Sequence, residues 1–179
     1  MRRGASRVVL AVLLASLTLS ASVSLGSELK THYVTVVYND RKYLREFNDN
    51  VSLGSLSYLV RNRNPLTAAE ETGDKLDVIV ERVEAVLDMF PRGLKFTVVL
   101  LPSSGDVQKV YRNKYGRSPD YIAFYSPRDN TVFVSLDDVR VGVLAHELTH
   151  VILVNYFGIS PPDKIQEVLA QFVETHFGN

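Results

Sequence analysis

Apolar residues recur along the chain with two different periods, which separate helical from extended segments. The helical period is clearest over residues 74–90, before Pro91 ends the run. The apolar positions on that face are Leu76, Ile79, Val80, Val83, Val86, Leu87 and Phe90. Residues 32–38 alternate valines and tyrosines, which predicts a strand. Residues 94–101 are almost continuously apolar, which is typical of a strand buried on both faces.

The remaining segments complete the predicted order of elements. Residues 42–60 are ambiguous, and we expect a helix there that is broken near Gly54. A short helix should follow residues 105–106, and residues 121–136 indicate a β-hairpin around a central turn. Two apolar helices should follow, the first ending at Gly158 and the second opening with Ser160 as its N-cap.

This order of strands and helices predicts an α+β domain. A small twisted sheet should pack on helices, with the first of the last two helices beneath the sheet. We expect residues 27–179 to form this one domain, since about 150 residues are enough to bury one core. The chain has no cysteine, so disulfides and thiolate metal ligands are excluded.

Two of the four histidines lie one helical turn apart, in the run His146-Glu147-Leu148-Thr149-His150. Positions i and i+4 of a helix share a face, so both imidazoles can reach one metal ion. Glu147 stays outside this ligand pair and can contact a water on the metal. Zinc hydrolases need this division between nitrogen ligands and a separate base. On a helix, the pattern is a metallopeptidase signature; the alternative is a pair of solvated histidines without a metal.

A hydrolytic zinc site takes a third protein ligand and leaves one position to water. Glu167 lies about two turns into the last helix, and a short turn between the helices would bring it opposite His150. Glu174, seven residues on, lies on nearly the same face and is the alternative ligand. We favour Glu167 because it lies within the apolar stretch, where an unpaired carboxylate would be costly to bury.

Residues 146–150 and 162–174 resemble the peptidase MA-like group of gluzincin zinc metallopeptidases. Those proteins show His-Glu-Leu-Thr-His followed by Pro-x-Trp-Leu-x-Glu-Gly-Leu-Ala-x-Tyr-x-Glu. The upstream residues 121–124 and 130–134 also resemble their strand pair. The resemblance covers residues 95–177 and implies a zincin-like fold with a thermolysin-like site. It implies that His146, His150 and Glu167 are the zinc ligands and that Glu147 is the general base.

The chain departs from the family pattern at three positions. Lys164 stands where tryptophan is common, and Val168 replaces a glycine. Gln171 stands where many gluzincins carry an acid that orients the first histidine. Loss of such a carboxylate commonly lowers metal affinity or activity about 10–100-fold.

The resemblance also implies where a substrate and its oxyanion are held. Gluzincins bind the substrate backbone along an exposed sheet edge, and we expect residues 131–135 to supply it. They usually carry a His, Tyr or Arg that donates to the oxyanion. His176 sits about half a turn round the helix from Glu167 and points away if the helix persists. Tyr121 and Tyr125 therefore remain as alternatives.

These features predict a zinc-dependent metallopeptidase that acts on a peptide or protein substrate. One alternative is a non-catalytic metal- or peptide-binding module that keeps a peptidase fold. Another is an iron oxygenase, because two histidines and a carboxylate also form its facial triad. Those sites usually sit on β-barrels, so a helical histidine pair with an adjacent glutamate argues against it.

The first 26 residues show the three-part layout of a secretory signal peptide: a basic start, an apolar run and then small residues. We expect export to the periplasm or outside the cell, with cleavage of this segment. Its retention as a membrane anchor is the alternative, although its apolar part is short for a spanning helix. The chain has 20 basic and 20 acidic residues without a strong basic cluster, so nothing favours binding to nucleic acid.

Overall fold

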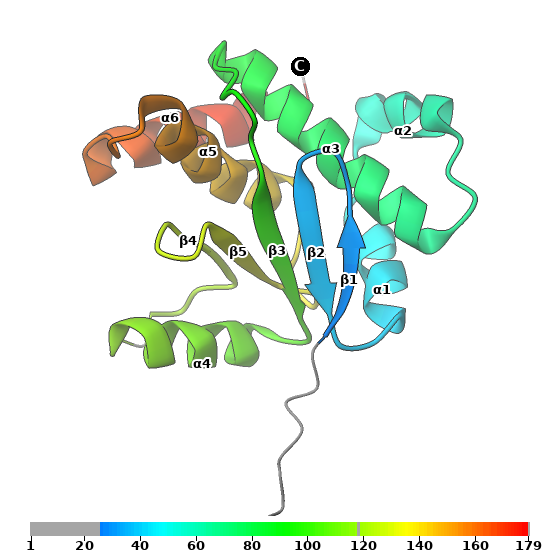
Figure 1. Cartoon of the computed structure of the whole chain (residues 1–179), viewed down its shortest axis with the longest axis horizontal. Coiled ribbons are helices and arrows are strands. Elements are labelled where there is room, and N and C mark those ends of the chain that lie inside the picture. The colour runs from blue at the N-terminus through cyan, green and yellow to red at the C-terminus, as the bar shows by residue number, and fades with distance from the viewer. Residues whose placement is uncertain (1–25, 118, 179) are drawn as a thin grey trace, which may run out of the picture.

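A computed structural model describes residues 26–117 and 119–178, and the predicted signal peptide lies outside these residues except for Gly26. The described chain folds into a five-stranded sheet with helices on both faces, so the α+β class is confirmed (Figure 1). The strands are β1 (Ser27–Lys30), β2 (Val34–Tyr38), β3 (Phe96–Leu101), β4 (Ala123–Ser126) and β5 (Thr131–Ser135). The helices are α1 (Lys42–Asn50), η1 (Gly54–Leu56), α2 (Ser57–Arg63), α3 (Ala68–Leu87), α4 (Ser104–Tyr115), α5 (Val141–Phe157) and α6 (Asp163–His176).

The strands run in the order β1-β2-β3-β5-β4 across the sheet. The three central strands β2, β3 and β5 are parallel, and the outer strands β1 and β4 pair antiparallel to their neighbours. The predicted hairpin is confirmed, since Phe124 of β4 faces Phe133 of β5. Parallel neighbours need a crossover, which α4 provides between β3 and β5.

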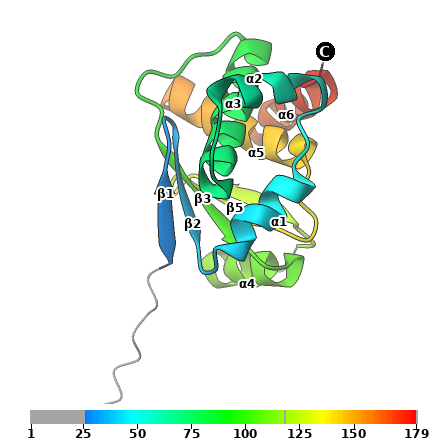
Figure 2. The ribbon, with the colours of Figure 1, turned by 90° about the vertical axis from the view of Figure 1, so that its right-hand side faces the viewer.

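Alternation along β3 divides the core between the two faces of the sheet. Val98 and Leu100 join the main core under α3 and α5, whereas Val99 and Leu101 contact a smaller cluster built around Val107 of α4. Figures 1 and 2 show α4 apart from the other helices. The continuous apolar run is therefore explained by a strand that has helices on both faces, although its face toward α4 is only partly buried and not fully buried as predicted.

Helix α3 differs from its predicted bounds. It begins six residues earlier, at Ala68, because Thr67 and Glu70 form a capping box. It ends at Leu87, after which Asp88 adopts a left-handed conformation. Phe90 lies beyond this end and is 58% exposed, so the prediction that it lies on the buried face is wrong.

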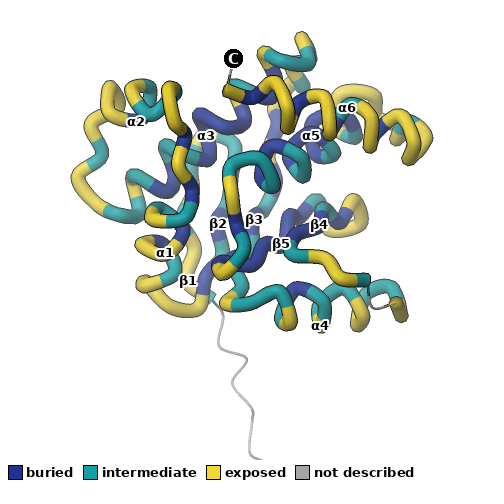
Figure 3. The backbone as a smooth tube through the Cα atoms, turned by 180° about the vertical axis from the view of Figure 1, so that it is seen from behind, coloured by how far each residue is buried: buried dark blue, intermediate teal, exposed yellow. Residues whose placement is uncertain are grey.

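The last two helices form an antiparallel pair. Helix α5 ends at Phe157, and Gly158 adopts the expected left-handed conformation with φ +68°. Helix α6 begins at Asp163 after Pro162 and has no side-chain cap, so the prediction of Ser160 as N-cap is wrong. Figure 3 shows α5 buried over much of its length, while the outer face of α6 is exposed. No helix in the described part of the chain is long and apolar enough to span a membrane.

Candidate metal centre

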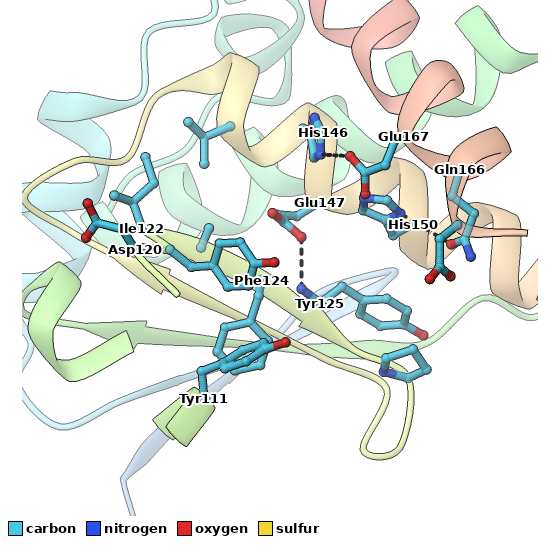
Figure 4. A pocket seen from close by; sticks show the side chains of 15 residues that line it. Tyr111, Asp120, Ile122, Phe124, Tyr125, His146, Glu147, His150, Gln166 and Glu167 are labelled. Atoms are coloured by element: carbon cyan, nitrogen blue, oxygen red, sulfur yellow. Dashed lines mark hydrogen bonds and ion pairs between the residues drawn. The ribbon is translucent and has the colours of Figure 1, made fainter. Parts of the chain in front are cut away.

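Three side chains from the α5–α6 pair converge on one point. His146 and His150 project from α5 and Glu167 from α6, as Figure 4 shows. Glu167 Oε2 lies 3.4 Å from His146 Nε2, and its Oε1 lies 3.5 Å from His150 Nε2. One ligand atom from each of the three residues lies within 4.8 Å of the others. The structure thus brings together the three residues that the sequence predicts as ligands.

The separations between imidazole and carboxylate atoms are close to those expected around a tetrahedral metal ion. Zinc binds imidazole nitrogen and carboxylate oxygen at about 2.0–2.2 Å, which puts neighbouring ligand atoms of a tetrahedron about 3.3–3.5 Å apart. The two separations between imidazole and carboxylate are close to this value, and they join different oxygens of Glu167, Oε2 for His146 and Oε1 for His150. Burial lowers the pKa of His150, although Gln166 and Glu167 oppose the effect, and this favours the neutral imidazole that binds metals. Two imidazoles and one carboxylate are a donor set that zinc accepts.

The same helix α6 also contacts the outer nitrogens of both histidines. His150 Nδ1 donates to Gln166 Oε1 at 3.3 Å, and Gln166 Nε2 donates to the backbone oxygen of Pro161 at 2.8 Å. His146 Nδ1 lies 3.5 Å from Glu174 Oε2. Such contacts hold Nδ1 outward and leave Nε2 aimed at the centre. Glu174, the alternative ligand, therefore lies against the far nitrogen of His146.

Two expectations about these acids need correction. The Glu167 side chain is 54% exposed, so burial is not the reason to prefer it as a ligand. The reason is that its carboxylate reaches the Nε2 atoms of both histidines. The orienting acid that many gluzincins carry at the position of Gln171 is absent. Glu174, one turn further along α6, contacts His146 instead. Gly142 leaves room for that approach, since a Cβ there would lie 3.3 Å from Glu174 Cγ. Sequence reasoning missed Gln166, although its place next to Glu167 was a usable signal.

Glu147 lies between the histidines and strand β4. Its Oε2 accepts a hydrogen bond from the Tyr125 backbone N–H at 2.8 Å, which the dashed line in Figure 4 marks. Burial raises the pKa of Glu147 to about 8, with the Tyr125 hydrogen bond opposing this rise and the charge of Glu167 adding to it. A metal cation bound by His146 and His150 would lower the pKa of Glu147 again. A carboxylate in this range can take up and release a proton near neutral pH.

The centre opens into a cleft of about 560 Å³ beside β4. Residues 131–135 do not form its edge, because β5 lies between β3 and β4. That prediction is wrong, and the open edge is β4. The Tyr125 N–H points away from β5 toward Glu147, so the backbone groups of Ala123, two residues earlier, also face outward.

The three candidates for the oxyanion donor, Tyr121, Tyr125 and His176, differ in their position relative to the cleft. Tyr121 and Tyr125 line the cleft. His176 does not, since its ring stacks on Phe172 with centroids 4.2 Å apart and its Nδ1 lies 2.8 Å from the Phe172 backbone oxygen. The Tyr125 hydroxyl donates to Asn130 Oδ1 at 2.8 Å, and burial raises the pKa of Tyr125 to about 12. Tyr121 is 44% exposed, which leaves it better placed than Tyr125 to meet a substrate.

Comparisons of the chain with protein-family models, with curated proteins and with solved structures find no match.

Proposed function

We propose that this protein is a zincin-like, gluzincin-type zinc metallopeptidase that hydrolyses peptide bonds. The observation that carries the proposal is the convergence of His146, His150 and Glu167 beside Glu147 at the floor of one cleft. The sequence pattern of the leader supports export, so we also propose that the protein acts outside the cytoplasm.

Each residue of the centre has a separate role in the proposed reaction. His146, His150 and Glu167 would hold the zinc ion. When bound, zinc would lower the pKa of a water toward about 7 and polarise the scissile carbonyl. Glu147 accepts a proton from the attacking water and delivers it to the nitrogen of the leaving amine. Glu174 and Gln166 keep the two imidazoles oriented through their Nδ1 atoms.

Strand β4 would hold the substrate backbone. An extended peptide can add to the open edge by main-chain hydrogen bonds, without a demand on its side chains. The outward groups of Ala123 are suited to this pairing, whereas the Tyr125 N–H is already used by Glu147. Pairing at this edge would pass the peptide between the aromatic residues of β4 and the metal centre.

Substrates with single N-methyl groups test this pairing without changing the protein. Each methyl removes one backbone donor, and only alternate residues of an added strand face β4. We expect the Michaelis constant to rise about tenfold at every second position near the scissile bond, as the loss of one hydrogen bond implies. Kinetics on a series of peptides methylated at successive positions would check this. A uniform response along the peptide would contradict strand addition.

Metal analysis combined with a peptide-library digest tests the function itself. Protein purified without added metals should contain about one zinc per chain and should cleave library peptides. Zinc without any cleavage would favour the non-catalytic binding module. Iron with turnover of 2-oxoglutarate would favour the oxygenase.

A further inference from the structure

The cleft has an aromatic end that the proposed chemistry does not use. Figure 4 shows Tyr111, Asp120 and Ile122 at the end opposite Gln166 and His150. Tyr111 projects from α4, and its ring packs edge-on against Tyr121 and against Phe124, each with centroids 5.0 Å apart. These edge-to-face contacts hold the three rings together as an aromatic cluster beside the open edge of β4.

Among the described residues, the Asp, Glu, Lys and Arg side chains that line the cleft are all acidic. Its lining contains four carboxylates, on Asp120, Glu147, Asp163 and Glu167, and neither lysine nor arginine. Without a metal, burial raises the pKa of Glu147 to about 8, so its carboxyl is mostly protonated at pH 7 and three negative charges remain. A divalent cation would lower that pKa again and would offset two of the four charges, which leaves two. The cleft is therefore negative with or without a metal, so it should favour cationic substrates and repel acidic ones.

Asp120 is the carboxylate at the aromatic end. It is exposed, and its Oδ1 accepts a hydrogen bond from the neutral amide of Gln108 at 2.8 Å. Among the ion pairs of the described residues, none involves Asp120. An exposed carboxylate beside aromatic rings suits a side chain that has a long hydrocarbon stem and a positive end.

We propose that this end of the cleft binds a lysine or arginine side chain of the substrate, with its stem on Tyr111 and Tyr121 and its charge at Asp120. The proposal rests on the proposed function, because it treats the cleft as a substrate site. It makes Asp120 a specificity-determining residue and predicts that basic peptides are preferred over acidic ones.

Peptide binding to the zinc-loaded Glu147→Gln variant would test the preference while preventing turnover. Three fluorescent peptides of equal length and aromatic content would differ only in carrying lysine, glutamine or glutamate at their variable positions. We expect the lysine peptide to bind at least about fivefold more tightly than the glutamate peptide by fluorescence anisotropy. This difference should shrink at about 1 M salt, where the Debye length is about 3 Å. Equal affinities, a preference for glutamate or no binding at all would overturn the proposal.

The Asp120→Asn change in the same background assigns the preference to one residue. It should reduce the ratio of lysine-peptide to glutamate-peptide affinity. The Asp49→Asn change removes the same charge from the exposed surface of α1, and it should leave that ratio unchanged. An unaltered ratio in Asp120→Asn would overturn the role of Asp120. Hydrolysis by the wild-type protein is a separate readout: its absence alone would refute the peptidase, whereas hydrolysis without a lysine preference would refute only the specificity.

Discussion

Replacing Glu147 with glutamine should abolish peptide hydrolysis and leave zinc binding nearly intact. The amide keeps the shape of the side chain and can still accept the Tyr125 N–H bond, but it cannot take a proton from water. Loss of general base catalysis typically costs about 10²–10⁴-fold in rate. Steady-state kinetics on a cleaved library peptide and zinc content by mass spectrometry would measure both effects on the same preparation.

A matched change shows whether the effect is local. Glu46 lies exposed on α1, away from the cleft, and Glu46→Gln should leave both kinetics and zinc content unchanged. Undiminished turnover in Glu147→Gln would refute its assignment as the base. Loss of zinc together with activity would instead indicate that the negative charge of Glu147 helps to hold the metal, since glutamine keeps the contact with Tyr125.

The local sequence pattern predicts much of this fold and of the candidate centre. The i, i+4 spacing of His146 and His150 fixes their common face as soon as the segment is helical, and Gly158 marks where that helix ends. A short connection then makes α6 the neighbour of α5, which is why the sequence predicts Glu167 opposite His150. These inferences depend only on residues close in sequence.

The corrections at the site depend on distant contacts, unlike those at the ends of α3 and α6. Which strand is the edge follows from the pairing of β5 with β3, across a crossover that holds α4, and no local pattern of residues 131–135 encodes it. The contact of Glu174 with His146 depends on how α6 crosses α5 and on the missing side chain at Gly142. Periodicity alone cannot supply crossing geometry or strand order.

The two glutamates of α6 should respond differently to removal, because Glu167 faces the Nε2 atoms of both histidines and Glu174 faces Nδ1 of His146. Glu174→Gln should lower zinc affinity about 10–100-fold, as the loss of an orienting carboxylate does. Glu167→Gln should lower it further, because it removes a ligand and not a support. Competition with a chelating fluorophore would give both affinities.

The visible spectrum of cobalt-substituted protein separates the two roles, since it reports the ligands of the ion. Glu167→Gln should change this spectrum, whereas Glu174→Gln should keep it and only weaken binding. Gln171→Glu is the matched control: it adds an acid one turn before Glu174, and it should alter affinity little if Glu174 already holds His146 Nδ1. An altered spectrum in Glu174→Gln combined with a normal one in Glu167→Gln would reverse the assignment, making Glu174 the ligand and Glu167 an exposed neighbour.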